Sequence, residues 1–542
     1  MKKNSFVEGT FIATFAIILV KVLGVLYVIP FYRIIGEAGG SLYSYAYTVY
    51  NLFLNISTAG IPVAISKIIT EYNALEKYEA KERAYHVGRN LILIISVIAF
   101  FMLFVFSKEF ASLILGEIEG GNTLEDVSFV IKSVSFCLLI IPFLSVSKGY
   151  LQGHKYISPT SASEVIEQVV RVAVILMGSY ITIKVLNKSV TLGVGVAVFG
   201  SFIGGLVAFL FLKYKIHKNK DLFKTSKEEN KEITNKDIIK KIITYAVPII
   251  ITSIATDIYN LTDMTLIVRT SYRLGYTALE SETIASIVAT WAPKICMIIN
   301  AVAMGMSVSL IPHMVDSFAR KDYKTSNQKY NQAMSIIIVV ALPMSIGLAF
   351  LSRPIYTLFY GESVYGPSIL AFASISAFFS CIYIIMNNAL QSLNKFKTAY
   401  ISTLSGFLTN ALLDVPFMYL FKALGLNAFY GTILATICGY FLSFIISFTS
   451  LKKAFNFNYK EIAKTIKDIL LPSISMVVVL MVLSFIINTS GLTTIQSIMV
   501  IVLFTLLGAI TYLLISYKTG LLERTFGKEY LNRIFKKLRL IR

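Results

Sequence analysis

The sequence predicts an all-α integral membrane protein with 14 transmembrane helices, arranged as two six-helix lobes followed by two C-terminal helices. Of the 542 residues, 56% are hydrophobic and only 15% are charged, whereas a soluble protein carries closer to a quarter charged residues. The apolar residues form repeated runs of about 20, the length that a helix needs to cross a bilayer. These runs are continuous rather than alternating, which argues against membrane strands.

The apolar runs define the spans and the domain organisation in order along the chain. We expect an N-lobe (1–213, helices 1–6), a cytoplasmic linker (214–241), a C-lobe (242–450, helices 7–12), helices 13 and 14 (451–516) and a basic cytoplasmic tail (517–542). The spans themselves are predicted at residues 11–34, 41–66, 91–114, 127–150, 162–186, 191–213, 242–268, 284–312, 331–351, 367–391, 398–420, 426–450, 468–488 and 494–516.

The charge of +20 is distributed unevenly. Most lysines and arginines fall in alternate loops and at both ends of the chain. By the positive-inside rule this asymmetry predicts a multi-pass plasma-membrane protein with cytoplasmic N- and C-termini. A solvated cytoplasmic face beside anionic lipid also explains the basic composition, so no nucleic-acid partner is expected.

An internal repeat relates the two lobes. Span 2 contains Asn55-Ile-Ser-Thr-Ala-Gly60-Ile-Pro-Val63, and span 8 contains Asn300-Ala-Val-Ala-Met-Gly305-Met-Ser-Val308, at an offset of 245. Both spans cross in the same direction, so the pattern predicts parallel six-helix repeats. Spans 13 and 14 lie outside the repeat.

Lys21 and Lys294 are the candidates among the lysines inside predicted spans, because charge within a membrane span usually marks a functional site. Lys21 falls near the middle of the membrane, because it lies roughly 20 Å along the first helix at 1.5 Å per residue. Lys294 lies in span 8 after Trp291 and Pro293. Both are candidate contacts for an anionic substrate; the alternative for Lys21 is a partner for a buried carboxylate on a neighbouring helix.

Span 5 carries two carboxylates and an arginine on one helical face. Glu164, Glu167 and Arg171 are spaced i, i+3 and i+7, and Glu167 and Arg171 are four residues apart, which permits an ion pair. The three residues are candidate substrate contacts, with Glu164 near the cytoplasmic boundary. A self-neutralising structural pair is the competing interpretation.

Oxygen-bearing side chains recur in spans 7 and 11. Asp257, Asn260 and Asp263 lie in the first of these, and Asn410 and Asp414 lie one turn apart in the second. Carboxylate and amide oxygens suit a small hard cation. Hydrogen bonding between helices is the alternative.

The sequence contains no catalytic constellation. It has no Ser/His/Asp grouping and no glycine-rich phosphate loop, and its histidines are scattered at His86, His154, His217 and His313. The predicted outer loops are short. We therefore do not expect an enzyme, and a membrane-embedded glycan-processing enzyme is the least favoured interpretation.

The turn between spans 4 and 5 carries the most specific motifs. The chain resembles the stage V sporulation protein B-like and lipid II flippase branch of the multidrug/oligosaccharidyl-lipid/polysaccharide exporter superfamily. The motifs are Gly149-Tyr150-x-Gln152-Gly153, Pro159-Thr160-x-x-Ser163 and Glu167-Gln168-x-x-Arg171, supported by Lys21-Val22-Leu23-Gly24 and by Gly60-Ile61-Pro62-Val63-Ala64-Ile65-Ser66-Lys67. The resemblance covers essentially the whole chain.

The resemblance implies a flippase that moves an undecaprenyl-pyrophosphate-linked cell-wall precursor across the membrane by alternating access, driven by membrane potential or an ion gradient. It implies a basic cavity in the first lobe, where Lys21 replaces the usual arginine, and a groove for the prenyl tail formed by helices 13 and 14. The lipid II flippases carry further arginines in spans 1 and 2, where this chain has Tyr27, Leu54 and Asn55.

The resemblance further implies a sodium ion between helices 7, 11 and 12. The span 7 aspartates, Asn410 and Asp414 would be its ligands, with Thr432 from the third helix. No other cofactor is expected, membrane lipids are the expected surroundings, and the chain is expected to act as a monomer. Two alternatives stay open: an exporter of another lipid-linked polysaccharide repeat unit, and a multidrug cation antiporter. The antiporters usually have 12 helices and acidic cavities.

Overall fold

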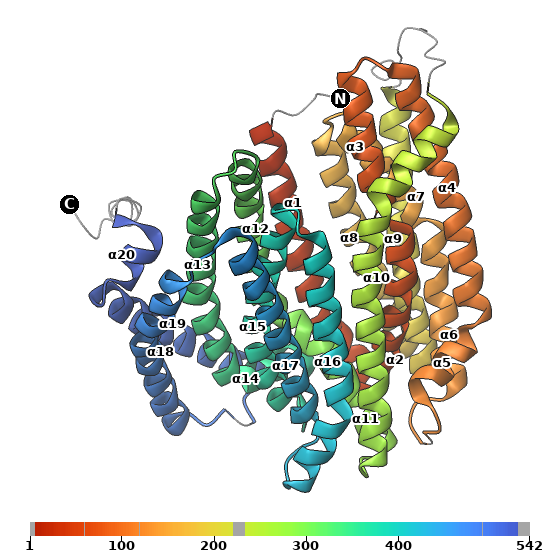
Figure 1. Cartoon of the computed structure of the whole chain (residues 1–542). Helices are drawn as coiled ribbons and strands as arrows, with labels where there is room; N and C mark the ends of the chain where they lie inside the picture. Colours follow the sequence, from red (N-terminus) through yellow and green to blue (C-terminus); the bar gives the residue numbers. More distant parts are fainter. Residues whose placement is uncertain (1–5, 59, 119, 220–232, 490, 529–542) are drawn as a thin grey trace. The chain divides into compact units, whose positions relative to one another are not determined.

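A computed structural model describes residues 6–58, 60–118, 120–219, 233–489 and 491–528. Within these residues the secondary structure is entirely helical (Figure 1), which confirms the predicted all-α class. The chain divides into two compact units, Met1–Ser286 and Ile287–Arg542. Each unit is described separately.

The first unit contains eleven of the α-helices in the described residues. They are α1 (Phe6–Leu26), α2 (Val28–Thr58), α3 (Ile61–Ala74), α4 (Tyr78–Val105), α5 (Ser107–Leu115), α6 (Leu124–Ser135), α7 (Ile141–Gly153), α8 (Ile157–Tyr180), α9 (Val190–Lys218), α10 (Asn235–Arg273) and α11 (Ala278–Ser286). A short 3₁₀ turn, Phe136–Leu139, joins α6 to α7.

The second unit begins with a π-helical turn, Ile287–Trp291, and continues through nine α-helices of its described residues. They are α12 (Ala292–Ala319), α13 (Tyr323–Phe350), α14 (Ser352–Tyr360), α15 (Gly366–Ser392), α16 (Phe396–Ala423), α17 (Phe429–Phe455), α18 (Lys460–Ile486), α19 (Thr494–Lys518) and α20 (Leu521–Phe526).

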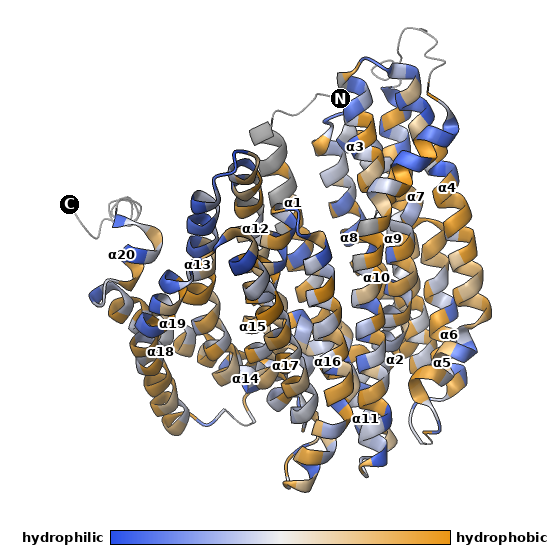
Figure 2. Ribbon diagram, viewed as in Figure 1, coloured by the Kyte–Doolittle hydropathy of each residue, from blue (hydrophilic) through white to orange (hydrophobic). Residues whose placement is uncertain are grey.

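Thirteen helical segments of the described chain are long and apolar enough to cross a membrane. They correspond in order to predicted spans 2–14, and the shorter apolar segment Phe15–Leu26 corresponds to span 1. Figure 2 shows hydrophobic residues along most of the length of α4 and α18. The structure therefore agrees with an integral membrane bundle, while the count of 14 stays a prediction.

The boundary between the first two spans differs from the prediction. We expected helix to residue 34 and a loop over 35–40, but α1 ends at Leu26 and α2 begins at Val28. The chain bends instead inside α2 at Gly36, whose φ of 68° is accessible to glycine without strain. Tyr27, at the junction, is buried and its hydroxyl lies 2.9 Å from that of Tyr43.

The Gly60-Ile61-Pro62 segment predicts a kink in span 2, because proline disrupts a helix, and the structure has a break there. Helix α2 ends at Thr58, and α3 begins at Ile61 with Gly60 as its N-cap and proline in its first turn. A Cβ atom on Gly60 would lie 2.4 Å from the carbonyl oxygen of Ala246 in α10. The glycine is therefore required for the close approach of two helices as well as for the break.

The helix bounds extend the internal repeat beyond the sequence motifs. Helices α4 and α13 differ by 245 residues at both ends, and so do α5 and α14. The starts of α8 and α16, and of α9 and α17, differ by 239 instead. The first half therefore holds extra residues after α5, and its broken α6–α7 segment corresponds to the unbroken α15.

The expected lobes and linker remain predictions. Of the predicted linker (214–241), residues 220–232 lie outside the described residues, and so do residues 529–542 of the predicted tail. The described part of the tail forms the short helix α20.

Candidate functional site

A charged cluster lies between α7 and α8 in the first unit. The Nζ atom of Lys148 is 3.1 Å from a carboxylate oxygen of Glu167 and 3.9 Å from one of Glu164. Arg171 completes the cluster, because its guanidinium lies 3.7 Å from Glu167. All four residues belong to segments long and apolar enough to span a membrane. The predicted Glu167–Arg171 pair is confirmed, and Lys148 is the partner that sequence reasoning missed.

Helix α1 packs against the same face of α8. A Cβ atom on Gly24 would lie 3.4 Å from the side-chain nitrogen of Gln168, whose side-chain oxygen accepts a hydrogen bond from Arg171. Lys21 lies three residues before Gly24, one helical turn away on a similar face of α1. Its side chain is exposed. The first helix thus brings Lys21 to the side of α1 that approaches the charged cluster.

Three tyrosines of the first unit lie near enough to Arg171 to interact with it electrostatically. The guanidinium interacts electrostatically with Tyr47, Tyr27 and Tyr43. The Tyr47 hydroxyl lies 2.6 Å from that of Ser201 in α9. Because phenolic hydroxyls both donate and accept hydrogen bonds, they supply a polar wall at membrane depth without adding charge.

The glycines of the span 4 motif serve helix packing. A Cβ atom on Gly149 would lie 2.5 Å from the Pro62 carbonyl oxygen, and one on Gly153 would lie 2.9 Å from that of Ser66. The Tyr150 hydroxyl donates a hydrogen bond to Glu82 in α4 at 2.9 Å. The motif therefore fixes α7 against α3 and α4, which positions Lys148 beside α8.

A second polar cluster involves α11 and the loop after α5. The backbone N–H of Asn122 donates to the Glu282 carboxylate at 2.8 Å, and its side-chain amide donates to the other carboxylate oxygen. Glu282 is fully buried. Arg269 of α10 donates to the carbonyl oxygens of Ser112 and Leu113 at the end of α5. Sequence reasoning missed this cluster, although a glutamate in an apolar run was the available signal.

The span 7 aspartates lie in the first unit. Asp257 is buried and accepts a 2.7 Å hydrogen bond from the side-chain amide of Asn55. Asp263, in the same helix, is half-buried. Asn55 occupies one of the positions where the resemblance predicts arginine, and in this chain it stabilises a carboxylate on α10.

Lys294 belongs to the second unit. It lies in the segment Ala278–Ser307, which is long and apolar enough to cross a membrane. Its Nζ atom lies 4.4 Å from the centroid of the Trp291 ring. An aromatic face stabilises an ammonium group in a region of low polarity.

Asn410, Asp414 and Thr432 also belong to the second unit, where α16 and α17 pack antiparallel. Gly406 packs against Gly439, and Gly431 packs against Met418. At each of these glycines a Cβ atom would clash with the backbone of the facing helix. This register brings Thr432 level with Asp414. Both Asn410 and Asp414 are buried, and the Asn410 amide donates to Asp414 at 3.1 Å.

The five predicted cation ligands therefore divide between the units, with two in the first and three in the second. Among the described residues, no group of three or more His, Cys, Asp and Glu side chains is arranged to hold a metal ion. A cation near Asp414 would have to be bound with amide, hydroxyl and backbone oxygens.

An apolar groove of about 420 Å³ lies among α13, α14, α18 and α19. Its wall includes Met344 of α13, Ile355 of α14, Leu480 of α18 and Phe504 of α19. The groove is long, lipophilic and built partly from the two helices outside the repeat.

Comparisons with known proteins identify the family. Residues 6–279 match the family described as polysaccharide biosynthesis protein, and residues 248–415 match the MatE family. The chain is 32% identical to the lipid II flippase MurJ of Bacillus subtilis (strain 168) over 537 residues, covering 97% of each chain. It is 24% identical to stage V sporulation protein B of the same organism, covering 75% of this chain and 77% of that protein.

A solved structure of lipid II flippase MurJ in an inward closed conformation superimposes with a TM-score of 0.70 at 18% identity. The match covers 95% of this chain and 99% of that one. At this identity the likeness establishes the fold. The chain belongs to the polysaccharide biosynthesis protein family, in the lipid II flippase and stage V sporulation protein B-like branch of the multidrug/oligosaccharidyl-lipid/polysaccharide exporter superfamily.

Proposed function

We propose that this chain is a flippase that moves an undecaprenyl-pyrophosphate-linked cell-wall precursor, similar to lipid II, from the inner to the outer leaflet. Its membership of a transporter superfamily makes it a membrane transporter rather than an enzyme. The observation that carries the substrate class is Lys21, on the side of α1 that approaches the charged cluster of Lys148, Glu164, Glu167 and Arg171. The cluster is neutral by itself, and Lys21 gives the group a net positive charge.

These polar residues would lower the energetic cost of moving the headgroup through the membrane. A pyrophosphate and its attached sugars cannot enter hydrocarbon without losing their hydration. Charged and hydroxyl side chains at membrane depth would replace that hydration, while the prenyl tail stays in lipid or in the apolar groove beside α18 and α19. Alternating access would then expose the polar path to the other leaflet, powered by membrane potential or an ion gradient.

The positive-inside distribution supports cytoplasmic N- and C-termini. In that orientation α5, α14 and the connection between α18 and α19 lie toward the outer face. The precursor would enter from the cytoplasmic side, where α3 packs against α7 and α10.

Lys21 is the proposed first contact for the pyrophosphate. Lys21→Ala is expected to abolish complementation of cells depleted of their lipid II flippase, because an exposed lysine contributes little to folding but supplies the cationic group. Expression and thermal stability should stay close to wild type. Growth of the depleted cells with Lys21→Ala would remove this residue from the site.

The direct assay measures which leaflet displays the precursor. Cells that depend on this chain are labelled with a membrane-impermeant reagent that modifies only outer-leaflet precursor. Wild type should raise the labelled fraction and Lys21→Ala should not. If wild type leaves precursor inaccessible, the flippase proposal is wrong.

The family description favours one second candidate, export of another lipid-linked polysaccharide repeat unit. The pyrophosphate and the prenyl chain would be common to both substrates. Complementation of a polysaccharide exporter, but not of a lipid II flippase, would select this alternative.

We further propose that Asn410, Asp414 and Thr432 contribute to a sodium site. Their oxygens suit a hard cation, and the α16–α17 register brings them level. Sodium should raise the melting temperature of the purified protein relative to equal potassium, because a ligand at 100 times its dissociation constant stabilises by about 2.7 kcal/mol. Asp414→Asn should remove the difference.

The matched control is Asp468→Asn on α18. Asp468 pairs with Arg524 at 2.7 Å and lies in a different part of the second unit. This variant should keep the sodium-dependent shift. Equal melting temperatures of wild type in the two salts would argue against the site.

A further inference from the structure

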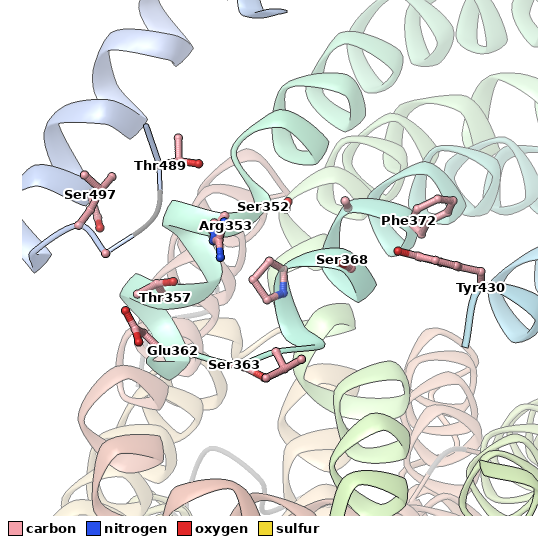
Figure 3. A pocket seen from close by; sticks show the side chains of 15 residues that line it. Ser352, Arg353, Thr357, Glu362, Ser363, Ser368, Phe372, Tyr430, Thr489 and Ser497 are labelled. Carbon is pink, nitrogen blue, oxygen red and sulfur yellow. The ribbon is translucent and has the colours of Figure 1, made fainter. Parts of the chain in front are cut away.

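The second unit contains a pocket of about 710 Å³ that has no role in the proposed transport path. We name it the α14 pocket. Its walls come from α14, the start of α15, the first turn of α17 and the connection from α18 to α19. Figure 3 shows Arg353 on α14, Phe372 on α15 and Tyr430 near the start of α17 around this space. Its volume is in the range of small-molecule sites.

The lining is hydroxyl-rich and balanced in charge. It holds one cation, Arg353, and one carboxylate, Glu362, together with six hydroxyl side chains: Ser352, Thr357, Ser363, Ser368, Thr489 and Ser497. An anion such as pyrophosphate would gain little from a pocket with no net charge. A hydrocarbon chain would leave these hydroxyls without water or partners. The lining therefore favours a neutral, polyhydroxylated ligand.

An aromatic pair supplies the other half of a saccharide site. Phe372 and Tyr430 lie with ring centroids 4.4 Å apart, and Phe372 is 41% exposed. A sugar ring has hydroxyls that donate and accept hydrogen bonds around its edge and C–H groups on its face. The hydroxyls at the edge can form hydrogen bonds with Arg353, Glu362 and the serines. The C–H face can pack against an aromatic ring.

The pocket shares two helices with the apolar groove. On α14, Ile355 lines the groove while Arg353 and Thr357 line the pocket. On α19, Ser497 lines the pocket, and Phe504, two turns further along, lines the groove. A lipid whose tail occupies the groove would therefore have its polar end near the α14 pocket.

We propose that the α14 pocket binds the sugar residues of the lipid-linked precursor on the outer face, after transport. This inference rests on the proposed flippase function and adds a second, outward subsite to it. The pocket holds the saccharide while the tail remains in the groove, and release from it completes the transport cycle.

The internal repeat offers a matched control. Lys108 of α5 stands at the position of Arg353 by the offset of 245, and Thr191 stands at the position of Tyr430 by the offset of 239. Lys108 pairs with Glu125 at 3.0 Å on an exposed surface. The first half therefore has a cation at the equivalent place but no tyrosine.

The experiment measures sugar binding to the purified full-length protein in lipid nanodiscs by saturation-transfer NMR. The probe is the disaccharide of N-acetylglucosamine, with inorganic pyrophosphate as competitor. Wild type should bind the disaccharide. Arg353→Ala and Tyr430→Ala should each weaken binding about tenfold, the effect of losing one good contact, and Ser497→Ala should weaken it less. Lys108→Ala should bind as wild type does.

Three results would overturn the inference: no binding by wild type, binding that Tyr430→Ala leaves unchanged, or loss of binding when pyrophosphate is added. Thermal melting of each variant checks that it is folded. Because the readout is binding, failure of the leaflet assay with retained sugar binding would reject the flippase and keep the pocket. Transport without sugar binding would support the flippase and reject the sugar site in the α14 pocket.

Discussion

Glu167→Ala is expected to destabilise the protein by about 3–5 kcal/mol and to abolish complementation. The carboxylate lies between Lys148 and Arg171, and the side chains of Glu167 and Lys148 are only 15% and 16% exposed. Removing it leaves Arg171 without its paired carboxylate and Lys148 with Glu164 alone, at 3.9 Å, in an apolar bundle. Thermal melting of the purified variant and growth of flippase-depleted cells measure the two effects.

The matched control is Glu79→Ala, which removes another glutamate paired with an arginine four residues away. The side chains of Arg83 and Glu79 are 30% and 41% exposed, so the loss should be about 0.5 kcal/mol. If the Glu167→Ala and Glu79→Ala proteins had the same melting temperature, the cluster would be solvated and unimportant for folding.

A double variant separates folding from function. Lys148→Met combined with Glu167→Gln removes one charge of each sign and fills similar volume, so it should recover most of the stability. If the charges form part of the substrate path, this variant should fold without complementing. Complementation by the double variant would show that the cluster serves structure alone.

Glu282→Ala is expected to destabilise the protein by about 2–6 kcal/mol, because it leaves two half-buried donors of Asn122 without this acceptor, at about 1–3 kcal/mol each. Gly121 lies against the same carboxylate, so closely that a Cβ atom there would be 2.0 Å from its oxygen. The loop after α5 should therefore detach from α11. Hydrogen exchange over residues 116–123 should accelerate well beyond that of α4.

Glu280→Ala is the control for this prediction. Glu280 accepts hydrogen bonds from Thr277 at the start of the same helix and is half-buried, so its loss should weaken the helix start by about 1 kcal/mol. Exchange in the loop after α5 should not change. Equal acceleration in both variants would indicate general loosening of α11 instead of a specific attachment.

The sequence by itself determined the fold class, the order of the spans and the repeat. These follow from hydrophobic run length and from residue spacing, which depend only on local sequence. The Glu167–Arg171 pair was also predictable, because both residues lie on one helix four positions apart. The helix break at Gly60 followed from the conformational limits of proline.

Only the tertiary structure decided which helices meet. Lys148 joins the charged cluster because the contacts of Gly149 and Gly153 set α7 against α3, and no spacing rule encodes a contact between different helices. The Glu282–Asn122 attachment joins residues 160 positions apart. The bend at Gly36 replaced the predicted loop because tertiary packing chose which glycine adopts positive φ. Local sequence sets the helices, and side-chain packing over long separations sets the site.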